Sequence, residues 1–258
     1  MNHSYYSSND YFNLNKDMHV NDSIAKANII SRIIEESIKP TPNQPFKILE
    51  IGGGAGLVSY HVIKHLSSSQ IFGNIPIVLH SLEPSSESIS LQKKNNEFIS
   101  NYFNCTLDHF SPDFKYDCIL LIDVLEHIED KRNAIYQLAV LGDYTLVNLP
   151  LENNFVDYLR NFLSRNKFYR HQRECLGHVH RFNYMSSLNQ FKKQFNILHY
   201  EHWPYYEHLY QLYSSKKIYL SRIRLLELFI SNLINRLFPF ISPYIIQGSN
   251  FILLHSKD

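Results

Sequence analysis

The chain has 258 residues, of which 44% are hydrophobic, so a sizeable core is expected in one large domain or in one domain with an insert. Its 25 Lys and Arg balance 24 Asp and Glu, which argues against a dedicated nucleic-acid binder. The three cysteines are an odd number without metal-ligand spacing and indicate reduced thiols in a cytoplasmic protein. A polar first segment and the lack of any apolar run of membrane-spanning length agree with that expectation.

The first predicted element is an amphipathic helix over residues 22–38, which follows an irregular, tyrosine-rich segment, 1–21. Apolar residues recur at helical spacing along it, namely Ile24, Ala27, Ile30, Ile34 and Ile38. Three prolines follow within residues 40–45, so the helix ends there and a linker leads to the next strand.

A dense glycine turn comes next, at residues 50–56, between a strand ending at Leu49 and a helix over residues 57–66. Strand, glycine turn and helix together predict a nucleotide-binding crevice, because glycine lets a ligand approach the backbone and the helix start offers free N–H groups. The dinucleotide fingerprint fails, since its sixth position counted from Gly52 is Leu57. No Gly-Lys-Ser/Thr follows the turn, which excludes a P-loop.

The turn fits a different pattern, acidic-x-Gly-x-Gly-x-Gly, at Glu50, Gly52, Gly54 and Gly56. It resembles motif I of class I S-adenosylmethionine-dependent methyltransferases, which implies S-adenosyl-L-methionine as the cofactor and makes Gly53 part of its site. In such enzymes the first segment often covers the cofactor. Here it would be either a loose tail or a lid, with aromatic cover from Tyr5, Tyr6, Tyr11 and Phe12.

The second predicted strand, residues 76–82, ends at Glu83 and Pro84. The resemblance implies that Glu83 accepts both ribose hydroxyls, as a carboxylate with two oxygens can. The alternative is that Glu83 caps the next predicted helix, over residues 85–100. Residues 101–108 are predicted to form the third strand and its exit, where Thr106, Leu107 and Asp108 match the adenine-contacting positions of the family.

The fourth predicted strand, Asp117–Ile122, runs into Asp123-Val124-Leu125-Glu126-His127. This segment resembles the motif after strand four in the small-molecule branch of the family, which implies that Asp123 and Val124 face the cofactor or the substrate. His127 is either a structural residue or a general base, because imidazole titrates near neutrality. In similar ubiquinone-pathway O-methyltransferases, the positions of Asp123, Glu126 and His127 can hold a divalent metal. The leading expectation for this chain is nevertheless that no metal is bound.

A helix over residues 131–141 and a fifth strand over residues 144–149 are predicted next, then a helix from Phe155 that runs into a basic, aromatic stretch. The following segment, Gly177-His178-Val179-His180, resembles one found over the active site of type 11 and type 12 methyltransferases. On an extended segment His178 and His180 point the same way and could face a substrate hydroxyl. The alternative is a bond from one of them to a backbone carbonyl, and zinc is disfavoured because no third ligand is evident. A helix over residues 186–195 is expected, capped by Ser186.

Strands six and seven are predicted at residues 195–200 and 250–255, with an unusually long connection, 201–249, between them. It contains a predicted helix, 221–237, with a wide apolar face and arginines beside it. One interpretation is a helical insert that completes a substrate pocket or a homodimer surface. The other is an interfacial segment, 221–246, that contacts a membrane peripherally.

The expected fold is a Rossmann-like, doubly wound α/β sheet of seven strands with strand seven antiparallel, in a single domain over residues 1–258. Its expected parts are a lid and helix (1–45), a core (46–200), the insert (201–249) and the last strand (250–256). The expected activity is methyl transfer to an oxygen or nitrogen of a small molecule such as a sugar, a lipid-linked glycan or a quinone-like acceptor. His127, His178 and His180 are the catalytic candidates. The alternatives are a non-catalytic cofactor-binding protein of the same fold and, ranked lower, a protein methyltransferase; no nucleic-acid partner is expected.

Overall fold

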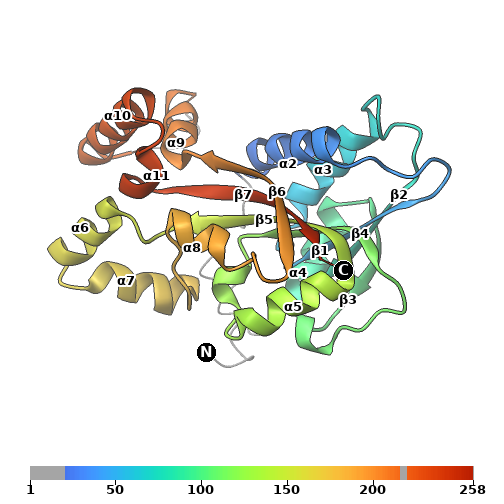
Figure 1. The fold of residues 1–258 in the computed structure, drawn as a ribbon. Coiled ribbons are helices and arrows are strands. Elements are labelled where there is room, and N and C mark those ends of the chain that lie inside the picture. Colours follow the sequence, from blue (N-terminus) through green and yellow to red (C-terminus); the bar gives the residue numbers. More distant parts are fainter. Residues whose placement is uncertain (1–20, 216–219, 258) are drawn as a thin grey trace.

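The computed structural model describes residues 21–215 and 220–257, so the tyrosines and phenylalanine proposed for a lid, at residues 5–12, lie outside this part (Figure 1). A seven-stranded sheet with the order β3-β2-β1-β4-β5-β7-β6 runs through the molecule, and β7 is antiparallel to both of its neighbours. This confirms the predicted fold. The strands are β1 (Phe46–Ile51), β2 (Ile77–Leu82), β3 (Ile99–Phe103), β4 (Tyr116–Ile122), β5 (Gly142–Leu151), β6 (Phe195–Trp203) and β7 (Gly248–Ser256).

Helices cover both faces of the sheet, as the burial of side chains on both sides of the central strand β4 shows. Alternate side chains of β4 enter different cores: Cys118 and Leu120 join the core beneath α2 (Ser23–Ser37) and α3 (Leu57–Ser67). Ile119 and Leu121 join the core beneath α5 (Lys131–Leu141). A strand buried on both faces explains why residues 118–122 form a continuous apolar run.

Two predicted helices have different bounds in the structure. The helix after β2 is α4 (Ser86–Asn95), capped by Ser85, and it stops before residue 100 because Asn96 is extended. The Asn96 side chain donates to the carbonyl of Gly56 and accepts from the N–H of Phe98, which turns the chain into β3. β3 therefore begins earlier than predicted and ends at Phe103, and residues 107–109 form a short 3₁₀ helix, η1 (Leu107–His109).

The other is the helix expected at residues 186–195, which is α8 (Tyr184–Asn189) in the structure. Its N-cap is Asn183, and Ser186 is the third helical residue instead of the cap. The side chain of each bonds to the backbone N–H of the other, which forms a capping box.

A helical end lies beyond the carboxyl ends of the parallel strands (Figure 1). The insert between β6 and β7 supplies α9 (Tyr205–Ser214), α10 (Arg222–Leu237) and α11 (Ser242–Ile245), and the segment after β5 supplies α6 (Phe155–Leu163) and α7 (Lys167–His171). Because β6 ends and β7 begins at this edge of the sheet, the insert emerges on the side where open α/β sheets bind ligands. Across the described ranges, no helix is long and apolar enough to cross a bilayer.

Candidate active site

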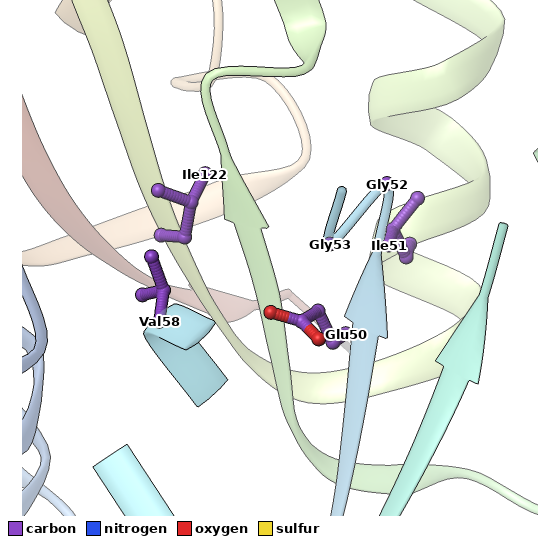
Figure 2. A pocket seen from close by; sticks show the side chains of 6 residues that line it. All are labelled: Glu50, Ile51, Gly52, Gly53, Val58 and Ile122. Atoms are coloured by element: carbon purple, nitrogen blue, oxygen red, sulfur yellow. The ribbon is translucent and has the colours of Figure 1, made fainter. Parts of the chain in front are cut away.

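The glycine turn after β1, which we call the cradle, has no room for side chains. Gly52, Gly54 and Gly56 have φ values of 65°, 53° and 75°, in the left-handed region that favours glycine. A Cβ on Gly53 would lie 2.3 Å from Cδ of Glu50, and one on Gly52 would lie 2.8 Å from a methyl of Val124. These positions must therefore be glycine because of the chain's own packing, and a small cleft beside the turn is lined by Glu50, Ile51, Gly52, Gly53, Val58 and Ile122 (Figure 2).

Two buried glutamates flank this turn. Glu50 accepts a hydrogen bond from the Ser59 hydroxyl at 2.6 Å, and burial raises the pKa of Glu50 to about 7. At the tip of β2, one oxygen of Glu83 accepts from the N–H of Gly54 at 3.3 Å and the other from the N–H of Ser85 at 3.1 Å. Burial, with a smaller contribution from the charge of Glu50, raises the pKa of Glu83 to about 7. Each Glu83 oxygen keeps a lone pair for a further donor.

The adenine positions have different surroundings. Leu107 is buried in η1, whereas Asp108 is exposed and accepts from the Asn133 amide at 3.2 Å. Asn104, which the sequence did not single out, donates to the carbonyls of Glu83 and Pro84, both at 3.0 Å. The exit of β3 is thereby tied to the tip of β2.

Asp123 directly follows β4 and has a strained backbone conformation, with a φ of 55°. One of its oxygens accepts from the Asn148 amide at 2.7 Å and the other from Lys26 Nζ at 2.5 Å. Burial lowers the pKa of Lys26, but the carboxylates of Asp123 and Asp22 outweigh it and raise that pKa above its ordinary value. Helix α2 is therefore fastened to the tip of β4 by a buried charge network.

The three candidate histidines differ in their partners. His178 Nδ1 donates to Glu152 at 2.7 Å, and the other Glu152 oxygen accepts from the Gln172 amide at 3.0 Å. His180 Nε2 instead donates to the carbonyls of Ile128 and Glu129, at 3.0 and 3.1 Å. His178 and His180 therefore do not present a matched pair of imidazoles.

His127 lies beside His178, with their ring centroids 4.8 Å apart, and its Nδ1 donates to the carbonyl of Gly177 at 3.3 Å. The buried Glu126 completes this group, and its Oε2 has no hydrogen-bond partner within the described chain. Burial raises the pKa of Glu126 well above its ordinary value, and the charges of Asp123 and Glu152 add to the effect.

Glu126, His127 and His178 each offer a ligand atom, and these atoms lie within 4.8 Å of one another. One carboxylate and two imidazoles suit a divalent transition metal. This donor set differs from the expected one, because His178 replaces Asp123, whose oxygens bond to Lys26 and Asn148.

Glu152, Gln172 and Lys26 were missed by the sequence analysis. Glu152 carried a signal, because it directly follows β5 and so had to lie at the carboxyl edge of the sheet. Gln172 and Lys26 carried none, since no local pattern marks Gln172, and tertiary packing brings Lys26 to Asp123 from 97 residues away in the chain.

Comparisons with known proteins agree with this geometry. The model of a methyltransferase domain family matches residues 25–196. A probable polyketide synthase of Dictyostelium discoideum is 29% identical over 153 residues, which cover 51% of this chain and 6% of the synthase. A ubiquinone biosynthesis O-methyltransferase of Rickettsia typhi is 27% identical over 93 residues, which cover 36% of this chain and 35% of that enzyme. The chain therefore spans only a small part of these curated relatives.

Solved structures share the fold. Magnesium protoporphyrin IX methyltransferase of Synechocystis, with bound S-adenosylhomocysteine, aligns with a TM-score of 0.59 over 98% of both chains at 11% identity. A mycolic acid cyclopropane synthase aligns with a TM-score of 0.56 at 13% identity, over 88% of this chain and 84% of that one. Since the family match covers most of the chain, this protein belongs to the class I S-adenosylmethionine-dependent methyltransferases.

Proposed function

We propose that the chain methylates a hydroxyl oxygen of a small-molecule acceptor, with His178 as the general base and Glu152 as its positioning residue. The observation that carries the proposal is the 2.7 Å bond from His178 Nδ1 to Glu152. It fixes the tautomer and leaves Nε2 as the basic nitrogen. The bond between Gln172 and Glu152 holds the carboxylate in that orientation.

The glycine turn and the two buried glutamates are the proposed cofactor site. Glu83 would accept both ribose hydroxyls, while the backbone of the turn at Gly52, Gly53 and Gly54 would contact the rest of the ligand. Glu50 would support the turn through Ser59. The remaining proposed contacts come from the tips of the neighbouring strands and from the cap of α3, namely Gly56, Pro84, Leu107, Asp108, Asp123 and Val124.

The chemistry divides between the cofactor and the chain. When bound, S-adenosylmethionine supplies a methyl group that is already electrophilic. The chain would orient the acceptor, exclude water and take the hydroxyl proton at His178 Nε2 as the oxygen–methyl bond forms and the sulfur–methyl bond breaks, which leaves a neutral thioether. His180 holds the loop that carries His178 against the loop after β4, and the backbone N–H groups of Val179 and His180 do the same through the carbonyl of Glu126.

The first test is calorimetric titration of wild type and Glu83→Ala with S-adenosylmethionine and, separately, with NADH. We expect micromolar binding of S-adenosylmethionine alone, weakened in the variant. Equal binding by both proteins would remove Glu83 from the site.

The second test is methyl transfer from labelled cofactor to a panel of sugars, lipid-linked glycans and hydroxylated aromatics. His178→Ala should lower kcat by roughly 100- to 10,000-fold with cofactor affinity unchanged. Glu152→Gln should lower kcat less and shift the pH profile, because the amide cannot stabilise an imidazolium. His171→Ala, an exposed histidine on α7, is the matched control. An unchanged kcat in His178→Ala would exclude it as the base.

A divalent ion is the rival use of the same side chains, and its support is the unpartnered oxygen of buried Glu126. Both imidazoles donate Nδ1–H to a carbonyl or carboxylate, as metal-ligating histidines ordinarily do. Metal analysis and titration with Zn²⁺ and Mn²⁺ distinguish the two. Stoichiometric metal that is lost in Glu126→Gln, together with activity abolished by chelators, would replace the base mechanism.

A further inference from the structure

Helix α6 is packed with its apolar side outward. Its exposed large hydrophobic side chains recur at helical spacing along one face, namely Phe155, Tyr158, Leu159, Phe162 and Leu163. Phe162 and Leu163 are 70% and 72% exposed. The inward face carries charge instead, because Asp157 is fully buried and Arg160 is largely covered. This reverses the usual arrangement of a surface helix.

Helix α10 and the segment after it also expose an apolar face, although α10 buries Leu228 as well. Exposed apolar side chains lie at Leu226, Phe229, Ile230, Leu233 and Leu237, again along one helical face. The exposed surface continues beyond the helix at Phe238, Phe240, Ile241 and Tyr244, with Phe240 91% exposed. We call these residues and the exposed face of α6 the apolar end surface.

A polar network beneath this surface holds both helices in that orientation. Arg160 on α6 bonds to Asp157 at 2.9 Å and pairs with Glu227 on α10. Glu227 also accepts from Arg224 at 2.6 Å and from the Tyr206 hydroxyl at 3.2 Å. These charges pair with one another between the helices. Rotating either helix to bury its apolar face would therefore separate a charge from its partner.

The rim of the apolar end surface is strongly basic although the whole chain is nearly neutral. Within residues 155–176 and 221–246 the exposed charged side chains are one acid, Glu174, and six cations: Arg165, Lys167, Arg170, Arg173, Arg222 and Arg236. The other two acids in these ranges, Asp157 and Glu227, form ion pairs with Arg160 and Arg224. A two-fold contact with a second copy would bring these like charges together. Contact with a negatively charged surface would instead bring these cations close to opposite charges.

We propose that the apolar end surface docks onto a bilayer that contains anionic phospholipids. Exposed leucine and phenylalanine side chains enter the acyl boundary, and the arginine rim meets the head groups. The sequence had suggested such contact for residues 221–246 alone, and the structure adds α6 and α7 at the same end of the molecule (Figure 1). Because α6 begins three residues after Glu152, the docked surface lies next to the proposed acceptor site.

Vesicle co-sedimentation tests the proposal without any turnover, so its result is independent of the proposed chemistry. We expect the protein to pellet with phosphatidylcholine vesicles that contain phosphatidylglycerol, and at least tenfold less with phosphatidylcholine alone. Binding should weaken steeply as salt is raised. The double variant Phe162→Asp/Phe229→Asp should lose binding, whereas Tyr136→Asp, at a 59% exposed position on α5, should keep it.

The pair Arg170→Glu/Arg173→Glu provides a second variant that leaves the apolar face intact, and it should reduce binding roughly tenfold or more. Thermal unfolding confirms that each variant is folded. Two results would overturn the proposal. One is pelleting that the aspartate and glutamate variants leave unchanged. The other is a dimer in light scattering that Phe229→Asp dissociates while wild type ignores both kinds of vesicle.

Discussion

Charged side chains have different surroundings at the two ends of this molecule. Around the glycine turn, apolar strands fill the interior, and the few buried charges lie where a ligand is expected, at Glu50, Glu83 and the Lys26–Asp123 pair. At the helical end, the buried Asp157 and the partly exposed Arg160 and Glu227 form ion pairs between helices that also expose apolar faces. Near the glycine turn, the charged residues therefore mark the proposed ligand site. At the helical end, they fix the orientation of α6 and α10, whose exposed faces we propose to meet a membrane.

Removing Lys26 should have the largest effect on stability. In Lys26→Met, the carboxylates of Asp22 and Asp123 lose their common cation in a buried setting. We expect the free energy of unfolding to fall by about 3–5 kcal/mol. Urea denaturation measures this, with Arg32→Leu as the control, because its ion pairs are largely exposed and should contribute below about 1 kcal/mol. Equal losses would show that the Lys26 network is not effectively buried.

Blocking the glycine turn should mainly affect the ligand. In Gly54→Arg, a side chain enters the cradle at a φ of 53°, and cofactor affinity should fall roughly 100-fold or more, about 2.7 kcal/mol. Calorimetry measures it, and Ser90→Arg, on the exposed side of α4, is the matched control. Binding that survives in Gly54→Arg would separate the turn from the cofactor.

Removing Arg160 tests the helical end. In Arg160→Leu, Asp157 stays buried with its main cation gone, and we expect a loss of about 2–3 kcal/mol, smaller than for Lys26 because Arg160 is 22% exposed. Burial already raises the pKa of Asp157 to about 6, so the loss should shrink below that pH, where the carboxyl takes up a proton. Denaturation at pH 5 and pH 8 measures both effects. A loss that is the same at both pH values would show that the charge of Asp157 is not its cause.

The smallest expected effect is a pH dependence of cofactor affinity. The pKa of Glu83 is raised to about 7 in the folded chain, so the carboxyl is largely protonated at pH 6 and largely ionised at pH 8. Two ribose hydroxyls donate best to the ionised form, so affinity should rise by about tenfold over this interval. Calorimetry at pH 6, 7 and 8 measures it, and Glu83→Gln should bind weakly without the rise. A flat profile in wild type would show that Glu83 keeps one protonation state on binding.

The raised pKa values of Glu83 and Glu50 should have the opposite effect on the stability of the cofactor-free protein, which should fall as the pH rises. The folded chain holds the Glu83 and Glu50 protons more tightly than the unfolded chain does. Stability from these groups is therefore complete below their ordinary pKa of 4.5 and declines as the pH rises towards 7.

Much of the core was predictable because its signals are local. Strands buried on both faces do not show an alternation of apolar and polar residues, but the continuous apolar run at residues 118–122 identifies such a strand. The glycine spacing at Gly52, Gly54 and Gly56 likewise identifies a strand, a turn and a helix within a few residues. The helix ends were less predictable. The stop of α4 depends on Asn96 bonding to Gly56, forty residues away in the chain, which no local pattern records.

The sequence by itself predicted the doubly wound sheet, the antiparallel seventh strand and the cofactor class, because a compact motif carries the resemblance to a family that implies all three. Only the tertiary structure decided that His178 pairs with Glu152 while His180 bonds to backbone, since both histidines occupy equivalent positions on an extended segment. It also decided that α6 and α10 turn their apolar faces outward. Helical periodicity gives a helix two faces, but which one is buried depends on the charges that meet beneath it, and here these come from different helices.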